Sequence, residues 1–134
     1  MHDVKLQTYW ADADPAGIVY FPHFFRFVEQ AEEEIYFHAG TTRQSLLDEF
    51  SVWMPRVESH VKFVSPIRNG RAILVRLNPI FKGEKTVRFE FEIQDHDEPK
   101  LLASGFMTVV CVDRDRFKAT PIPVKIRAVL AGHQ

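Results

Sequence analysis

The residues best suited to chemistry lie in the segment 12–40, DADPAGIVYFPHFFRFVEQAEEEIYFHAG, where two carboxylates precede a long helical pattern. The first turn of a helix leaves backbone N–H groups without intrahelical partners and carries the positive end of the helix dipole. A carboxylate at Asp14 beside such donors could act as a base or a nucleophile, while the donors stabilise an oxyanion. The sequence therefore predicts a reactive junction between a strand and a helix.

The flanking residues indicate how this junction is built. Apolar and polar residues alternate over Val4–Trp10, as in a strand with one buried face. Asp14 precedes a proline, which favours an extended or turn conformation, and Gly17 permits positive φ or a close backbone approach. From about Pro22 to His38 apolar residues recur with helical spacing, and Gly40 is placed to end the helix.

The rest of the chain reads mainly as strands. A short helix is expected over 41–50, then strands over 58–65, 71–81, from 86 (with strict alternation over 87–93) and 101–112, and a short helix over 124–130. Consecutive strands joined by turns imply an antiparallel sheet, and the long helix must cover one of its faces. The fold class is thus α+β, with about five strands wrapped on one long helix. This is the layout of a hot-dog fold, although the pattern alone leaves other α+β arrangements open.

Length and composition limit the function classes. With 134 residues we expect one domain over 1–134. A net charge of −1 predicts no general attraction to nucleic acid or anionic membranes, and no apolar run approaches the roughly 20 residues that span a bilayer. The amino terminus lacks the apolar region of a signal peptide, and a single cysteine fits a reducing compartment, so the expected location is the cytosol. Twelve phenylalanines exceed what one small core can hide, which favours an oligomer.

At this point the segment Asp14–Pro22, DPAGIVYFP, resembles the signature of the 4-hydroxybenzoyl-CoA thioesterase family of hot-dog proteins. It follows a strand and opens the long helix, as the family motif does. Further matches are Val61-Lys62-Phe63 ahead of Pro66 and Val109–Asp113 at the last strand, so the resemblance covers nearly the whole chain. The Asp-Pro-Ala-Gly form is associated with the aromatic acyl-CoA branch. Short-chain relatives, including the Tol-Pal-associated group, tend to have a histidine where this chain has Phe21.

The resemblance implies a role for specific residues. Asp14 corresponds to the catalytic carboxylate, either as nucleophile or as general base on water, and Gly17 belongs to the same catalytic loop. The backbone N–H of Phe21 corresponds to the donor that polarises the thioester carbonyl. The substrate and CoA contacts that it implies fall on Tyr20, His23, Lys82, Lys85, Thr86 and Arg88. Family members are homo-oligomers, commonly dimers of dimers, whose active sites lie between subunits.

Several alternatives remain open. A short-chain or broad-range acyl-CoA thioesterase would use the same residues, and a non-catalytic acyl-CoA-binding protein would need no Asp14 chemistry. Dehydration or hydration of hydroxyacyl thioesters is disfavoured, because the histidine motifs of such enzymes are absent. No paired-histidine motif accompanies Asp12, Asp14 and His23, so neither a metal nor a cofactor is expected.

Other polar residues have simpler interpretations. Asp12 is expected to cap or brace the loop. The run Glu32-Glu33-Glu34 is typical of a solvated helix face, with Glu32 closest to the apolar stripe. Cys111, inside an apolar strand, is expected to be an inert core thiol.

Overall fold

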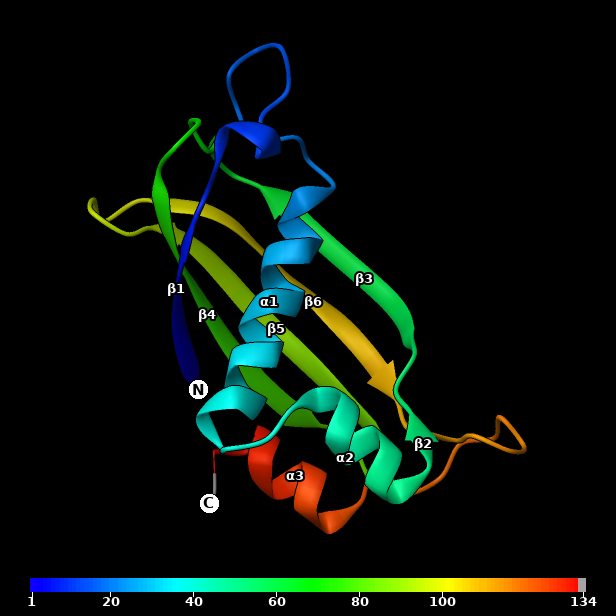
Figure 1. The fold of residues 1–134 in the computed structure, drawn as a ribbon. Helices are drawn as coiled ribbons and strands as arrows, with labels where there is room; N and C mark the ends of the chain where they lie inside the picture. The colour runs from blue at the N-terminus through cyan, green and yellow to red at the C-terminus, as the bar shows by residue number, and fades with distance from the viewer. Residues whose placement is uncertain (133–134) are drawn as a thin grey trace.

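The computed structural model describes residues 1–132 and consists of an antiparallel sheet crossed by a long helix (Figure 1). The bounds are β1 His2–Gln7, a 3-10 helix η1 Trp10–Asp12, α1 His23–His38, α2 Arg43–Phe50, β2 Val52–Trp53, β3 Arg56–Phe63, β4 Ala72–Phe81, β5 Thr86–Asp95, β6 Leu101–Val110, β7 Val112–Asp113 and α3 Val124–Leu130. The main sheet has the order β1-β4-β5-β6-β3, and β2 pairs with β7 separately. The expected α+β hot-dog layout is confirmed.

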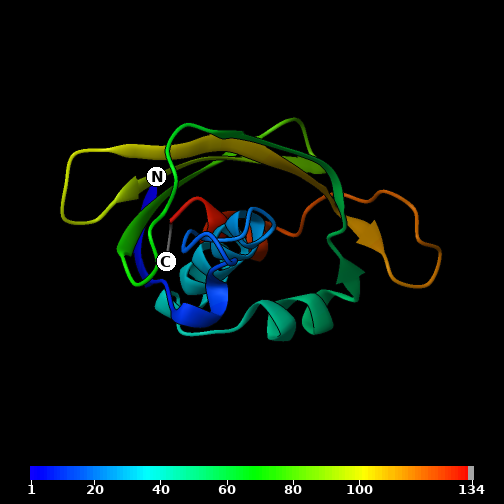
Figure 2. The same ribbon diagram turned by 90° about the horizontal axis from the view of Figure 1, so that it is seen from above.

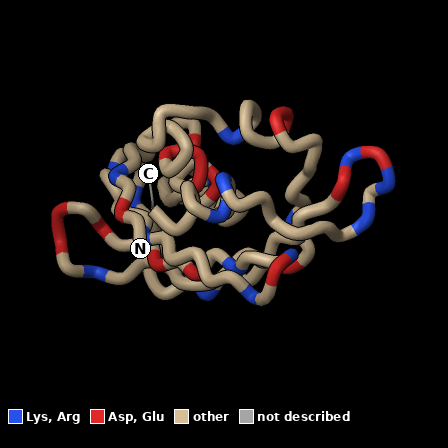
Figure 3. Tube along the Cα trace, turned by 90° about the horizontal axis from the view of Figure 1, so that it is seen from below, with Lys and Arg blue, Asp and Glu red and all other residues tan. Residues whose placement is uncertain are grey.

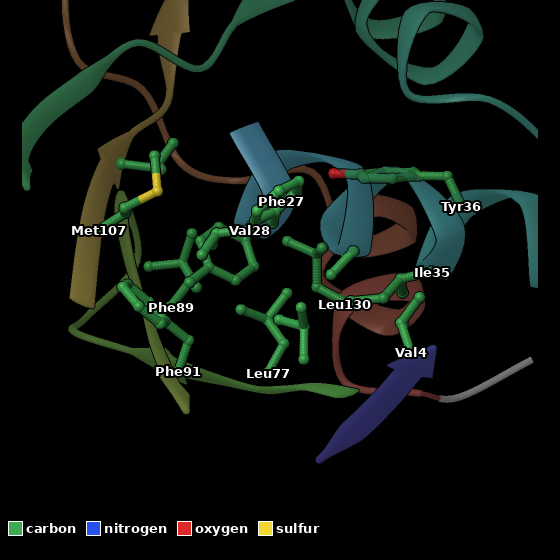
Figure 4. Close-up of a cluster of buried hydrophobic side chains, with 14 of the residues drawn as sticks. Val4, Phe27, Val28, Ile35, Tyr36, Leu77, Phe89, Phe91, Met107 and Leu130 are labelled. Carbon is green, nitrogen blue, oxygen red and sulfur yellow. The ribbon is translucent and has the colours of Figure 1, made fainter. Parts of the chain in front are cut away.

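The sheet curves around α1, which lies on its concave side (Figure 2). The apolar stripe of α1 supplies Phe27 and Val28, whose side chains point toward Phe89 and Leu77 of the sheet (Figure 4). All four are essentially inaccessible to solvent. Burying a side chain of this size is worth about 1.5–3 kcal/mol. The predicted helical spacing and the predicted alternation of β5 therefore describe two halves of the same core.

Three strands differ in their bounds from those expected. The strand expected over 58–65 is β3, Arg56–Phe63, two residues earlier at each end. The first strand ends at Gln7 rather than Trp10, because the Thr8 N–H and Oγ1 both donate to the Arg71 carbonyl and residues 10–12 turn into η1. The final strand ends at Val110, because the Cys111 N–H turns aside to donate to the Lys85 carbonyl at 2.9 Å. The strand ends at Gln7 and Val110 are both set by hydrogen bonds between segments that are distant in the sequence.

The free edge of the sheet at β3 is long and largely exposed. Val57, Phe63 and Val64 at or just beyond this strand are each about half exposed. An exposed edge strand presents unpaired backbone groups and can pair with another chain. Among residues 1–132, no helix has both the length and the apolar character needed to cross a membrane.

Candidate active site

The loop that carries Asp14 is held as a tight hairpin by its own backbone. The Asp14 N–H donates to the Ile18 carbonyl at 2.9 Å, and the Gly17 N–H donates to the Asp14 carbonyl at 3.0 Å. Gly17 has a φ of 79°, a conformation that residues with a Cβ rarely adopt. The Asp14 side chain uses Oδ1 to accept the Ala16 N–H at 2.8 Å. The second carboxylate oxygen accepts no hydrogen bond from residues 1–132, so it is available to a ligand.

Asp12 braces the base of this loop, as expected. Its carboxylate accepts a hydrogen bond from the Arg26 guanidinium on α1 and another, at 2.8 Å, from the Tyr9 N–H. The Tyr20 N–H donates to the Asp12 carbonyl at 2.9 Å. These contacts fix the loop to the first turns of α1, so the position of Asp14 relative to the helix start is defined.

The helix start leaves one backbone donor available. The N–H groups of His23 and Phe24 donate to the carbonyls of Tyr20 and Phe21, and Pro22 has no N–H. Within the described part of the chain, the Phe21 N–H donates to no acceptor. A helix N-terminus favours negative charge, so this free donor is suited to polarising a carbonyl oxygen.

An apolar hollow of about 290 Å³ lies beside Phe21, and its lining also includes Phe24, Phe63 and Val64. The Phe63 ring meets Phe24 edge to face at 4.9 Å and Phe21 at 6.2 Å between ring centroids. On the other side of the loop, Asp14 borders a second hollow of about 630 Å³ whose rim includes Trp10, 85% exposed. The loop thus separates an aromatic hollow from a wider one that contains the carboxylate.

Tyr20 and His23 lie at this junction, as the sequence predicted. Their rings are 6.0 Å apart, and the Tyr20 ring contacts Phe21 edge to face at 5.2 Å. The structure therefore places Tyr20, Phe21 and His23 together at the helix start, while Asp14 and Gly17 lie in the hairpin that precedes it. Their catalytic and binding roles stay predictions.

The cations expected to bind CoA lie at the other end of the sheet in the same subunit. Asp14 is close to the start of β4, because the Gly17 carbonyl accepts the Asn69 N–H, whereas Thr86 begins β5 at the opposite end. The length of β5 corresponds to about 30 Å. One subunit therefore does not bring Lys85 and Thr86 to Asp14.

The four expected CoA contacts also differ in their surroundings. Lys82 and Lys85 are exposed, and neither forms an ion pair with residues 1–132. Arg88 lies 3.5 Å from Glu58 and stacks on Phe106, with its guanidinium carbon 4.1 Å from the ring centroid. Arg88 is therefore a less available cation than the two lysines.

Sequence reasoning missed two groups at the site. Phe63 at the end of β3 and Val64 just after it form one wall of the aromatic hollow, and no local pattern places them beside α1. The loop after β7, at the Lys85 end of the sheet, carries both basic and acidic residues (Figure 3). Its basic residues include Arg116 and Lys118, which are exposed. The family resemblance at Val109–Asp113 located the start of this loop in the sequence, but it did not predict which way the loop extends from the sheet.

The expectation for Glu32 was wrong. This carboxylate is not on a solvated helix face but is buried, 3% exposed, and forms ion pairs with Arg56 and Arg43. Burial raises the pKa of Glu32, while the two guanidinium groups oppose that rise. No cluster of three or more side chains able to ligate a metal is found among residues 1–132.

Comparison with known proteins gives consistent results. Residues 8–130 match the family model of the thioesterase-like superfamily. A 1,4-dihydroxy-2-naphthoyl-CoA hydrolase of Synechocystis sp. is 27% identical over 117 residues, which cover 87% of this chain and 85% of that protein. The acyl-CoA thioester hydrolase YbgC of Escherichia coli O6:H1 is 26% identical over 123 residues, covering 92% and 90%. The crystal structure of Slr0204, a 1,4-dihydroxy-2-naphthoyl-CoA thioesterase from Synechocystis, superposes with a TM-score of 0.89 at 25% identity, covering 96% of this chain and 93% of that one.

Proposed function

Because the chain belongs to the thioesterase-like superfamily, we propose that it hydrolyses acyl-CoA thioesters to the free acid and CoA, with an aromatic acyl group of the benzoyl or hydroxybenzoyl type as the preferred substrate. The observation that carries this proposal is the arrangement around Phe21. A free backbone donor and an aromatic hollow meet at the start of α1, and the hairpin that precedes this helix start carries a carboxylate with an available oxygen.

The chemistry follows from that arrangement. With the thioester carbonyl oxygen against the Phe21 N–H, negative charge that develops during attack is stabilised by a donor already in position. Asp14 then either attacks the carbonyl carbon to form a mixed anhydride and release CoA thiolate, or takes a proton from an attacking water. A single turnover in ¹⁸O-water separates the two routes. The anhydride route leaves ¹⁸O in the Asp14 carboxylate when water opens the anhydride at that carbonyl, whereas the water route labels only the product acid.

The aromatic preference is supported by the hollow beside Phe21. Its volume of about 290 Å³ exceeds the roughly 150 Å³ cavity known to accept a benzene ring. Edge-to-face contacts with Phe24 and Phe63 would add about 0.5–1.5 kcal/mol each beyond area burial. The similar Synechocystis enzyme is named for a naphthoyl thioester, which is also aromatic. The Asp-Pro-Ala-Gly motif supports the 4-hydroxybenzoyl-CoA branch in particular.

We further propose a homo-oligomer whose active sites lie between subunits. If two copies pair antiparallel through β3 about a two-fold axis, the Phe63 end of one strand lies beside the Arg56 end of the other. Within one subunit Arg56 pairs with Val109, and the next residue, Val110, pairs with Thr86, so the Arg56 end of β3 is also the cationic end of the sheet. Two-fold pairing through β3 would therefore bring the cationic end of the partner toward Asp14. Lys82, Lys85 and Thr86 would then bind CoA across the interface. A dimer of dimers, one domain over 1–134 and a cytosolic location remain our expectations.

Thiol release from a panel of acyl-CoAs tests the proposal. Benzoyl-, 4-hydroxybenzoyl- and 1,4-dihydroxy-2-naphthoyl-CoA should be hydrolysed faster than butyryl-CoA, and Asp14→Asn should abolish most of the activity. A preference for butyryl-CoA would favour a short-chain or broad-range enzyme, an alternative that the similarity to YbgC supports. Tight binding with no thiol released from any thioester would leave an acyl-CoA-binding protein instead.

A further inference from the structure

A buried ionic cluster joins three elements at the middle of α1. The Glu32 carboxylate forms a direct hydrogen-bonded ion pair with the Arg56 guanidinium. It also lies 3.8 Å from the Arg43 guanidinium. Arg56 opens the edge strand β3 and Arg43 opens α2. Glu32 therefore ties α1 to the first residue of each of these elements.

The other carboxylates of the cluster are half exposed and differ from Glu32. Glu29 lies 3.5 Å from Arg56 and 3.6 Å from Arg43, and Glu33 lies 3.1 Å from Arg43. The side chain of Glu32 is 4% exposed, against 46% for Glu29 and 42% for Glu33. Loosening a buried ion pair leaves a desolvated charge without its partner, so Glu32 constrains Arg56 more strongly than the surface carboxylates do.

The segment held by Arg56 is a bent corner with an apolar surface. Trp53, Met54 and Pro55 precede β3 and line a hollow of about 480 Å³ together with the two arginines. The register of β3 against β6 shifts between Arg56 and Glu58, so Val57 bulges outward and is 59% exposed. Backbone contacts hold one side of this corner, since the Val110 N–H donates to the Pro55 carbonyl at 3.2 Å and β2 pairs with β7. The ion pair of Arg56 with Glu32 adds the side-chain contact that joins the corner to α1.

Two-fold pairing through β3 gives this corner a second neighbour. In any isologous antiparallel pair, the start of one strand lies beside the end of the other. The Trp53–Arg56 corner of one subunit then meets the Phe63 end of its partner, where the aromatic hollow beside Phe21 is open. An apolar corner against an apolar hollow is a complementary match.

We propose that Glu32 is a positioning residue for the partner subunit's active site: through its ion pair with Arg56 it fixes the Trp53–Arg56 corner as the wall that closes the partner's aromatic hollow. This inference rests on the proposed thioesterase function and on the two-fold pairing. It assigns Glu32 an effect on acyl-group binding in the other subunit and none on the chemical step there.

The first test compares Glu32→Gln with Glu34→Gln. Glu34 is the matched control, since it is on the same helix and its ion pair is a 4.0 Å contact with His38 at the surface. With benzoyl-CoA, Glu32→Gln should raise KM about tenfold and leave kcat within about twofold, because loss of a positioning contact misplaces the bound group. Glu34→Gln should match the wild type. An unchanged KM in a folded Glu32→Gln protein would overturn the proposal.

Mixed dimers decide whether the effect crosses the interface. Two tags allow purification of dimers with Asp14→Asn in one subunit and Glu32→Gln in the other. If Glu32 acts on the partner's site, the active site with a native Asp14 is closed by the Trp53–Arg56 corner of the other subunit, in which Glu32 is native. Such dimers should recover the wild-type KM at about half the wild-type kcat. If the raised KM persists, Glu32 acts within its own subunit and the proposal is wrong.

Two further outcomes are distinguishable. If Glu32→Gln fails to fold, Arg56→Lys replaces it in both experiments, because lysine keeps the charge but loses the planar fork that meets the carboxylate. The predicted KM change and its rescue in mixed dimers are then the same. If the wild-type protein hydrolyses no thioester, the proposed function itself fails and this inference fails with it. If the wild-type protein hydrolyses thioesters but the mixed dimers keep the raised KM, the proposed function stands and only the inference about Glu32 is overturned.

Discussion

Replacing Asp14 by asparagine removes the proposed base or nucleophile with little change in shape. In the structure Oδ1 accepts the Ala16 N–H at 2.8 Å, and an asparagine oxygen can accept the same bond. The other carboxylate oxygen becomes an amide nitrogen, which can neither attack a thioester nor accept a proton from water. The substitution therefore separates the chemistry of this residue from its part in the loop.

The two effects differ in size. Loss of a positioned general base reduces rates by about 10²–10⁴-fold, which corresponds to about 2.7–5.4 kcal/mol in activation free energy. The loop retains its hydrogen bond, and an exposed hydrogen bond of this kind contributes about 1 kcal/mol at most. We therefore expect kcat for benzoyl-CoA to fall at least a hundredfold while the melting temperature stays within a few degrees of that of the wild type.

The assay is release of free CoA thiol under saturating substrate, with thermal unfolding measured on the same preparations. Asp12→Asn is the control, since Asp12 lies two residues away but holds Arg26 and the Tyr9 N–H. It should lose about 1–2 kcal/mol of stability. An Asp14→Asn enzyme with more than a tenth of the wild-type kcat would refute the assignment of Asp14.

Three further predictions concern the loop, the CoA site and the stability of the sheet end. Gly17→Ala adds no clash but places alanine at a φ of 79°, so it should lower stability by about 1–2 kcal/mol and also lower kcat. Gly40→Ala, at a φ of 80° on the far end of α1, is the control and should cost the same stability with kcat unchanged. Unfolding and turnover assays on both variants check this prediction. Lys85→Ala should raise KM for acyl-CoA several-fold at low salt with kcat unchanged. Because salt screens exposed charges, this increase in KM should shrink in high salt. An increase in KM that is the same at low and high salt would contradict the contact between Lys85 and the CoA phosphates. Asp95→Asn should lower stability by about 1–2 kcal/mol at neutral pH, because hydrogen bonds from Arg71 hold the pKa of Asp95 at about 2, below its usual value of 3.8. That contribution is present above pH 4 and is lost as the pH falls toward 2, so denaturant titrations of mutant and wild type should converge there.

Local patterns were sufficient for the long elements of the fold but predicted neither η1 nor the short strand β2. Helical spacing located α1 to within a residue of its observed start, because its apolar stripe has to face the sheet. Strict alternation located β5 for the same reason. The strand ends at Gln7 and Val110 were predicted wrongly because they are set by hydrogen bonds to Arg71 and Lys85, which no local pattern contains. The bounds of β3 were also predicted two residues too late.

By itself, the sequence determined the composition of the junction: a carboxylate in a turn, a glycine suited to positive φ and a helix start five or six residues beyond that glycine. These are local properties, and the structure has each of them in place. Tertiary structure decided everything that depends on distant segments. It placed Phe63 beside Phe24, buried Glu32 against Arg56, and put the lysines expected to bind CoA at the far end of the sheet. Such contacts depend on how separate elements pack around a shared core, and so only the folded chain defines them.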